Sequence, residues 1–178
     1  MKNLFIITLT ILAITINGYS QVKVSYDFDK ETDFSKFSSY NFTEEAMKLP
    51  VNDLNRKRLL TAVDNEMSKR GFSKTDNPDL LIDLKVTTEM KQSATATTDW
   101  YGSGYRYRWG STFTTTNIDI TEYTEGTIFV DLIDTSTSKL VWQGRGIGTI
   151  HPSVKAEKRE KRINKGLAKI FKNYPPAL

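Results

Sequence analysis

The densest group of side chains suited to binding lies in a short aromatic segment near the middle of the chain. Ten residues hold two tryptophans, three tyrosines and two arginines, interspersed with glycine: Trp100, Tyr101, Tyr105, Arg106, Tyr107, Arg108 and Trp109. Aromatic faces bury much area while indole and phenol edges still form hydrogen bonds, so the segment suits a sugar, a peptide or a protein surface. The alternation of tyrosine with arginine equally fits a strand with its aromatic side turned inward. The sequence leaves both interpretations open.

Catalytic and metal chemistry find little support in the remaining polar residues. His151 is the only histidine and there is no cysteine, which excludes the usual zinc sites. A Ser-His-Asp relay would have to use His151, which precedes Pro152 at an expected strand-to-helix junction with no nucleophile elbow nearby. We therefore expect no catalytic residue, no metal and no cofactor.

Four carboxylates alternate near the amino terminus, in a pattern that can supply oxygen ligands to calcium: Asp27, Asp29, Glu31 and Asp33. An EF-hand loop also needs glycine at its sixth position and an acid at its twelfth. Those positions hold Thr32 and Ser38. The pattern therefore predicts a solvated strand edge that runs into a turn.

Three glycines alternate near the carboxyl-terminal third of the chain, at Gly144, Gly146 and Gly148. A nucleotide-binding glycine loop lies between a strand and a helix, whereas these glycines fall inside an expected strand. They leave one face of that strand bare, which usually marks the close approach of another backbone. We expect a helix to pack there, with a bound ligand as the alternative.

The segment 154–172 predicts a basic amphipathic helix. It contains eight Lys or Arg and two Glu, a net charge of +6 in a chain whose total is +4. Such a helix can lie on an anionic membrane surface, but its apolar stripe is only wide enough to pack on a sheet. Contact with a membrane surface through 154–172 is the secondary expectation, and nucleic acid is not expected as a partner.

Residues 1–20 predict a removable secretory signal. Lys2 precedes an apolar run of about 13 residues, shorter than the roughly 20 that span a bilayer. No further run of that kind follows, so the mature chain is expected to have no transmembrane span. Because bacterial lipid anchors are attached to cysteine, and none is present, we expect an exported, soluble periplasmic protein without a lipid anchor or disulfides.

The hydrophobic pattern then gives the elements that must position these residues. Alternating apolar residues predict strands, and apolar stripes of helical period predict two helices, 52–70 and 153–173. The helix 52–70 has Asn52 or Asp53 as its N-cap and Gly71 as its terminating glycine. The expected strands are 22–29, 37–43, 80–86, 112–123, 127–134 and 140–150, with Gly126 breaking the fourth from the fifth.

This order, β-β-α-β-β-β-β-α, predicts an α+β two-layer sandwich. Hairpin-linked strands favour a mostly antiparallel sheet, and two helices with one apolar stripe each would pack on one of its faces. We expect a single domain over 21–178.

The chain resembles the domain-of-unknown-function 4136 family of bacterial envelope proteins. The resemblance rests on short motifs in a fixed order over nearly all of 21–178: Tyr26-Asp27-Phe28-Asp29, Asp33-Phe34-Ser35, Tyr40-Asn41-Phe42, Gly71-Phe72, Asn77-Pro78-Asp79-Leu80-Leu81, 126–134, 139–144 and Tyr174-Pro175-Pro176. It implies an exported, often lipid-anchored domain with no established activity and no catalytic residues to transfer. This sequence departs from that form by lacking the lipid-bearing cysteine.

Together these features predict a non-enzymatic binding or accessory module of the cell envelope. Its partner would be a glycan, a peptide or a protein, contacted through the aromatic segment. The alternative is a carboxylate-dependent hydrolase of cell-envelope polymer that uses Asp27, Asp29 or Asp131; this would need two carboxylates about 5–10 Å apart in one cleft.

Overall fold

The computed structural model describes residues 22–99 and 115–176. It is an α+β fold with one open sheet, two long helices and one short helix. The elements follow one another as β1 (Lys23–Phe28), the 3-10 turn η1 (Phe34–Lys36), β2 (Ser39–Phe42), α2 (Glu44–Met47), α3 (Asp53–Lys69), β3 (Ser73–Lys74), β4 (Leu80–Asp99), β5 (Thr115–Asp134), β6 (Lys139–Ile150) and α4 (Ala156–Phe171).

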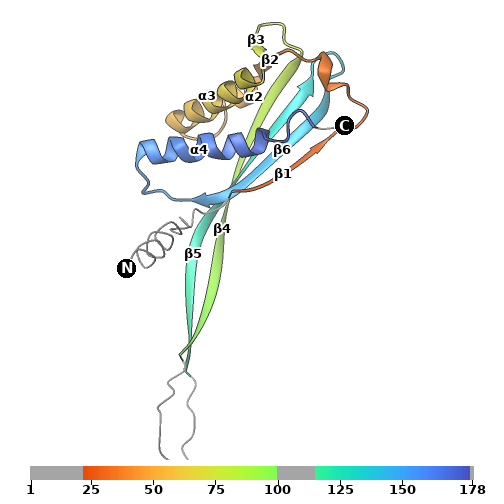
Figure 1. Ribbon diagram of the computed structural model, residues 1–178. Coiled ribbons are helices and arrows are strands. Elements are labelled where there is room, and N and C mark those ends of the chain that lie inside the picture. Colours follow the sequence, from red (N-terminus) through yellow and green to blue (C-terminus); the bar gives the residue numbers. More distant parts are fainter. Residues whose placement is uncertain (1–21, 100–114, 177–178) are drawn as a thin grey trace, which may run out of the picture.

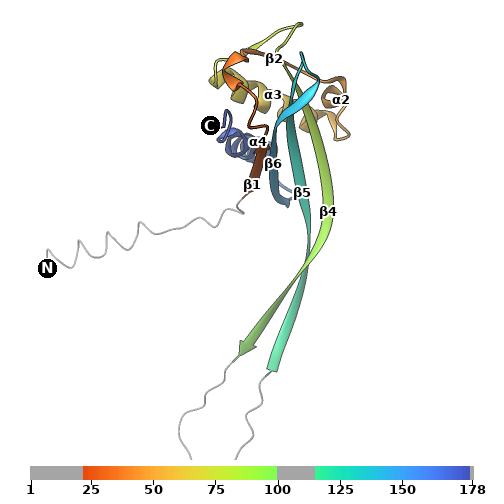
Figure 2. The same cartoon turned by 90° about the vertical axis from the view of Figure 1, so that its right-hand side faces the viewer.

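The six strands form a mixed sheet in the order β1-β6-β5-β4-β2-β3. Neighbours from β1 to β4 pair antiparallel, while β2 pairs in parallel with β4 and β3. Figures 1 and 2 show α3 and α4 side by side on one face of this sheet. The predicted α+β architecture with helices on one face is confirmed.

The central hairpin is longer and more continuous than the sequence pattern indicated. β4 runs on to Asp99 rather than ending near residue 86, and β5 passes through Gly126 without a break. Gly126 pairs with Thr88 on one side and Gly148 on the other. Ladder partners on both sides hold its backbone extended, so the prediction of a break there was wrong. Beyond the other strands, β4 and β5 continue as a two-stranded ribbon that projects away from the helices (Figure 1).

Helix α3 begins and ends where its capping residues predicted. The Asn52 side chain accepts a hydrogen bond from the backbone N–H of Asn55 (2.8 Å). At the other end Gly71 has a φ of +82°, and the backbone N–H of Phe72 donates to the carbonyl of Met67 (3.1 Å). This is the Schellman arrangement, in which glycine tolerates the left-handed conformation and the freed carbonyls are satisfied.

Helix α4 begins later than predicted. Ser153 was the expected N-cap, but the helix starts at Ala156 after Lys155, and Lys155 provides no side-chain hydrogen bond. The buried stripe is as predicted, with Leu167, Ile170 and Phe171 facing the sheet. The segment between β6 and α4 is therefore a loop, and this loop borders the site described below.

The core lies between the helices and the sheet and closes around an aromatic cluster. Trp142 stacks on Phe171 at 5.7 Å between ring centroids, and Tyr174 meets Trp142 edge-on at 5.3 Å. Arg70 donates to the carbonyls of Tyr174 (3.0 Å) and Phe171 (2.6 Å) and so joins the end of α3 to the end of α4. Glu66 is buried beside it; burial raises the pKa of that carboxyl, but hydrogen bonds from Lys69 and Arg70 outweigh burial and lower it.

Candidate functional site

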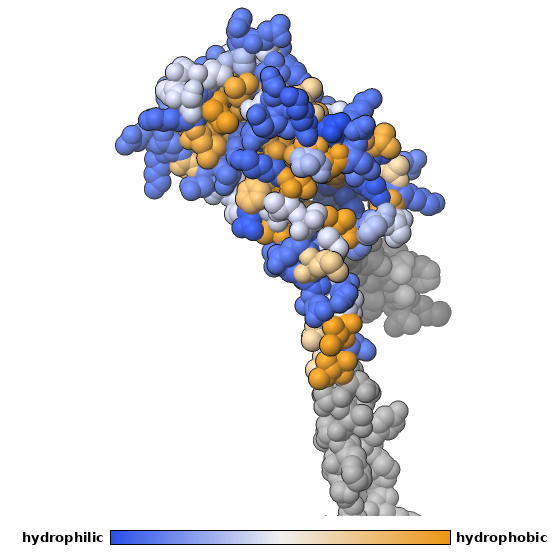
Figure 3. Space-filling model, turned by 180° about the vertical axis from the view of Figure 1, so that it is seen from behind, coloured by the Kyte–Doolittle hydropathy of each residue, from blue (hydrophilic) through white to orange (hydrophobic). Residues whose placement is uncertain are grey.

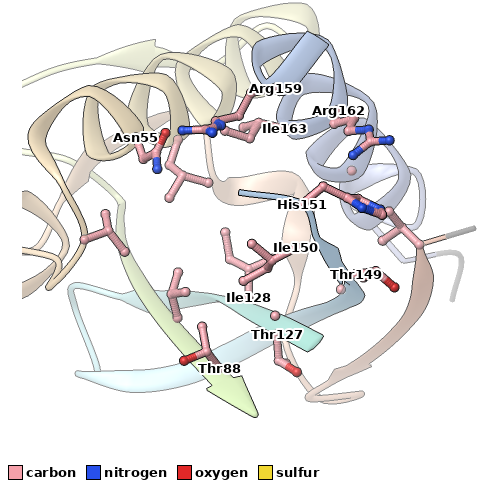
Figure 4. A pocket seen from close by; sticks show the side chains of 18 of the residues that line it. Asn55, Thr88, Thr127, Ile128, Thr149, Ile150, His151, Arg159, Arg162 and Ile163 are labelled. Atoms are coloured by element: carbon pink, nitrogen blue, oxygen red, sulfur yellow. The ribbon is translucent and has the colours of Figure 1, made fainter. Parts of the chain in front are cut away.

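A cavity of about 510 Å³ opens where α3 and α4 stand away from the sheet. Its walls come from α3, α4, the β6–α4 loop and strands β4, β5 and β6, with Val22 at the edge. Figure 4 shows Asn55, Arg159 and Ile163 on the helix side of this space and Ile128 and Ile150 on the sheet side. The volume lies within the range of roughly 300–1,000 Å³ typical of small-molecule sites.

The cavity wall is aliphatic. Ten of its lining side chains are Val, Leu or Ile, and none is Phe, Tyr or Trp: Val22, Val51, Leu59, Val86, Ile128, Ile150, Val154, Ile163, Leu167 and Ile170. Most are only half-buried, in contrast to the fully buried Trp142 and Phe171 of the neighbouring core. The apolar interior therefore stays accessible at this end of the helix–sheet layer.

Glycines contribute to the hollow. Gly126 and Gly148 pair directly across β5 and β6, and Gly146 and Gly166 also line the cavity. A Cβ built on Gly148 would meet nothing nearer than a methyl of Val22, at 3.6 Å. The space above Gly148 is therefore open to an added side chain, and α4 does not fill it.

The prediction that a helix packs on the bare glycine face is confirmed for two of the three glycines. A Cβ on Gly144 would collide with the side chains of Ile170 and Trp142, and one on Gly146 would lie 2.7 Å from Ile170 Cδ1. Ile170 belongs to α4, so this helix occupies the face left free by Gly144 and Gly146. Gly148 faces the cavity instead.

The ionisable side chains of the cavity lie toward its rim, since His151 and Arg162 are exposed and Arg159 is half-buried. They include His151, Arg159 and Arg162, which with Asn55 are drawn in Figure 4. Arg159 donates to the carbonyls of Pro152 (2.8 Å) and Val154 (3.4 Å) and so holds the β6–α4 loop against the helix. The cavity lining includes no Asp or Glu among the residues that the structure describes.

The aromatic segment singled out from the sequence lies outside the described residues. Trp100, Tyr101, Tyr105, Arg106, Tyr107, Arg108 and Trp109 all fall between the end of β4 at Asp99 and the start of β5 at Thr115. Its binding role therefore stays a prediction.

The amino-terminal carboxylates take part in local turns. Asp29 accepts from the backbone N–H of Glu31 (3.0 Å) and from the Thr32 hydroxyl (3.0 Å), and these bonds lower the pKa of its carboxyl. Asp33 caps η1 by accepting from Ser35. Within residues 22–99 and 115–176, no cluster of three His, Cys, Asp or Glu could hold a metal ion.

The carboxylates of the hydrolase alternative lie away from the cavity. Asp131 is buried on the opposite face of the sheet, where Gln143 Nε2 donates to its Oδ1 (2.7 Å). Asp27 is exposed and pairs in register with Gln143 on the neighbouring strand. Neither Asp27, Asp29 nor Asp131 lines the cavity.

The sequence contains one signal for the cavity. The alternating glycines indicated a bare strand face, and a ligand was the alternative to a helix. The sequence does not show which residue pairs with Gly148 on the neighbouring strand. That partner is Gly126, which the sequence pattern predicted to be a break between two strands. The sequence predicts His151 at a strand-to-helix junction and Arg159 on a basic amphipathic helix, and neither pattern indicates that these residues line a cavity.

The fold and the cavity together define a small α+β domain with a ligand-sized apolar pocket. The chain belongs to the DUF4136 family, a domain of unknown function whose model matches residues 24–176. No curated protein sequence matches this chain.

The fold also occurs in a solved structure. A PDZ domain protein from Parabacteroides distasonis superimposes with a TM-score of 0.54 at 15% identity over 89% of this chain, which spans 37% of that protein's length. The PelC dodecamer from Paraburkholderia phytofirmans aligns with a TM-score of 0.47 at 12% identity, over 85% of this chain and 95% of the PelC chain.

None of the helices within residues 22–99 and 115–176 has the length and apolar character needed to cross a bilayer.

Proposed function

We propose that this protein is a non-enzymatic binding module exported to the cell envelope, and that the cavity between α3, α4 and the sheet takes the apolar part of its ligand. The observation that carries this proposal is the cavity itself: about 510 Å³ of space with ten aliphatic side chains in its wall. An open apolar surface of this extent is costly in water. A bound apolar group would remove that cost.

Binding is favoured over hydrolysis by what surrounds the cavity. Hydrolysis of a glycan needs an acid and a second carboxylate on either side of the bond, and the cavity lining contains no described carboxylate. Asp29 is engaged in its own turn and Asp131 by Gln143. Nothing in these contacts prepares either group for proton transfer to a bound substrate.

The pocket is tested with Nile red, a neutral dye that fluoresces in apolar surroundings. We expect saturable fluorescence with the purified protein and its loss in Gly148→Val, because a side chain there would enter the open space above the strand. Thr87→Val is the matched control, since Thr87 is an exposed residue in the same sheet and does not line the cavity. Equal dye binding by all three proteins would refute the pocket.

The proposal that the protein is exported rests on residues 1–20, in which Lys2 precedes the apolar run. We expect the protein in the periplasmic fraction of expressing cells, with Gln21 as its first residue. Amino-terminal sequencing checks this directly. Unprocessed protein in the cytoplasmic fraction would contradict it.

The aromatic segment is the second surface of this proposal and would contact an envelope glycan, peptide or protein. Replacing Trp100, Tyr105 and Trp109 together by Ala should abolish capture of a partner from envelope extract and leave the melting temperature nearly unchanged. A large fall in melting temperature would show that these residues are part of the folded core. The basic segment 154–172 adds a surface that can lie against anionic lipid.

A further inference from the structure

We infer that the ligand of the cavity is an anionic amphiphile, whose alkyl chain occupies the aliphatic space and whose carboxylate or phosphate lies at the rim beside Arg162 and His151. This inference rests on the proposed binding function of the cavity and goes beyond it by naming the chemical class of the ligand.

The first argument is the nature of the wall. Ten Val, Leu and Ile side chains provide a surface without a flat face, and no described lining residue is Phe, Tyr or Trp. Sugars and aromatic ligands are commonly held against the rings of Trp, Tyr or Phe, and the described lining contains none of these residues. A flexible alkyl chain gains from burial in proportion to its area and needs no specific orientation.

The second argument is the sign of the charge at the rim. The ionisable side chains among the described lining residues are His151, Arg159 and Arg162. Carboxylates do occur nearby on α4, at Glu157 and Glu160, but both are exposed and neither lines the cavity. The rim therefore presents fixed positive charge that no lining carboxylate neutralises.

The third argument distinguishes the two arginines. Arg159 already donates to the carbonyls of Pro152 and Val154, so it serves the loop. The Arg162 side chain has no hydrogen bond or ion pair with the residues that the structure describes. In the view of Figure 4, the Arg162 and His151 side chains lie toward one side of the cavity, and Arg159, which is bonded to the loop carbonyls, extends toward Asn55 on the other side.

These positions fit the two ends of an amphiphile. The guanidinium of Arg162 can donate two parallel hydrogen bonds to a carboxylate or phosphate, and His151, on the same side of the cavity in Figure 4, offers a further ring N–H. The chain would then run from this end over Ile128 and Ile150, which Figure 4 places in the middle of the cavity. The net charge of +6 over 154–172 would attract such anions from solution.

The test compares three twelve-carbon probes, each below its micelle concentration, by displacement of Nile red: dodecanoate, dodecanol and dodecyltrimethylammonium. We expect dodecanoate to displace the dye at least about tenfold more tightly than either of the others, as one charge-assisted hydrogen bond would give. Across carboxylates of eight, ten and twelve carbons, affinity should rise about threefold to fourfold per methylene.

Two arginine variants separate the head-group contact from overall charge. Arg162→Gln should weaken dodecanoate about tenfold and leave dodecanol unchanged. Arg145→Gln removes the same charge from the opposite face of the sheet, where Arg145 lies over the ring of Phe129, and should leave both probes unchanged. A fall in dodecanoate affinity of equal size in both variants would overturn the head-group assignment.

The outcomes also separate this inference from the proposed function. Equal affinity for dodecanoate and dodecanol would refute an anionic ligand and leave an apolar binding pocket. Failure of Nile red and all three probes to bind would refute both. A parallel titration with lysophosphatidylglycerol identifies the source of the anion: tighter binding than dodecanoate indicates a lipid head group, and weaker binding indicates a free fatty acid.

Discussion

Asp134 is almost fully buried at the end of β5, yet the surrounding donors favour its charged form. Burial raises the pKa of its carboxyl, but hydrogen bonds from the hydroxyl and backbone N–H of Ser136 and from Lys36 outweigh burial, so the pKa is well below its ordinary value. Lys36 Nζ lies 2.9 Å from Asp134 Oδ2, although the two residues are 98 positions apart in sequence. This ion pair links η1 to the end of β5, just before the turn that leads to β6.

This pair predicts an acid-sensitive part of the stability. A carboxyl with a lower pKa in the folded protein stabilises it above the unfolded-state pKa, and this stability is lost as pH falls below that value toward the folded-state pKa. Asp134→Asn should therefore lower the free energy of unfolding by about 1–3 kcal/mol at neutral pH. The difference from wild type should shrink as pH falls from about 5 to 2.

Urea unfolding between pH 2 and 7 measures this difference. Asp119→Asn, at an exposed position on β5, is the control and should change stability little at any pH. A deficit in Asp134→Asn that stays constant with pH would show that its cause is lost packing and not lost charge.

The sequence alone predicted only part of the environment of Asp134. The sequence placed Asp134 at the end of a strand before a turn, and its hydrogen bonds to Ser136 are the local part of that environment. Lys36 was not identified as its partner, because their contact arises from the packing of distant segments. The same limit applies to Glu66: its partners Lys69 and Arg70 are local, but Arg70 also donates to the distant carbonyls of Phe171 and Tyr174.

At the scale of elements, two glycines should respond in opposite ways to the same substitution. Gly166 lies inside α4, and a Cβ there would meet only a methyl of Val22 at 4.0 Å. Gly144 lies in β6 directly beneath Ile170 and beside Trp142. The first position has room for a methyl group and the second does not.

Gly166→Ala should raise the free energy of unfolding by about 0.5–1 kcal/mol, because alanine reduces the backbone entropy lost when the helix forms. Gly144→Ala should lower it by about 1–3 kcal/mol, because the added methyl pushes α4 from the sheet. Urea denaturation of the two variants beside wild type measures both changes. Stabilisation by Gly144→Ala would contradict the close packing of α4 on this strand.

The elements that the sequence predicted best are those with local signals. Helix α3 has its side-chain cap at Asn52 and its left-handed glycine at Gly71, and both ends were placed correctly. Helix α4 lacks a side-chain cap at Lys155, so the prediction of the more typical Ser153 as its N-cap was wrong. The predicted break at Gly126 was wrong for a related reason. Glycine often marks a break in a strand, and only the neighbouring strands show that the Gly126 backbone stays extended.

At the scale of the whole molecule, the pocket could not be predicted from the sequence, because its lining residues come from several separate segments. Its wall combines Leu59 of α3, Ile163 of α4, Val86 of β4 and Ile150 of β6. In the sequence each of these residues was simply an apolar position of a helix or strand. The α+β class followed from periodicity, while the distance at which two helices stand from the sheet depends on side-chain volumes across several elements.

The molecule is also divided into a packed head and a two-stranded ribbon. β6 pairs with β5 only as far as Thr124, and β2 pairs with β4 only at its first residues. Beyond these points, residues 91–99 and 115–123 pair with each other alone. Ile118 and Ile120 on this ribbon are exposed, and Figure 3 shows an apolar cluster at the far end of its described part.

This division predicts two levels of stability in one chain. An isolated two-stranded hairpin is marginal in water, so the amide protons of 91–99 and 115–123 should exchange through local opening. Those of 80–86 and 128–134 lie in the packed part of the sheet and should exchange only through global unfolding. Native-state hydrogen exchange in low urea measures both groups. Protection of the ribbon equal to that of the head, and unchanged on dilution, would contradict this division, because it would require stabilising contacts within the monomer that the described pairing does not supply.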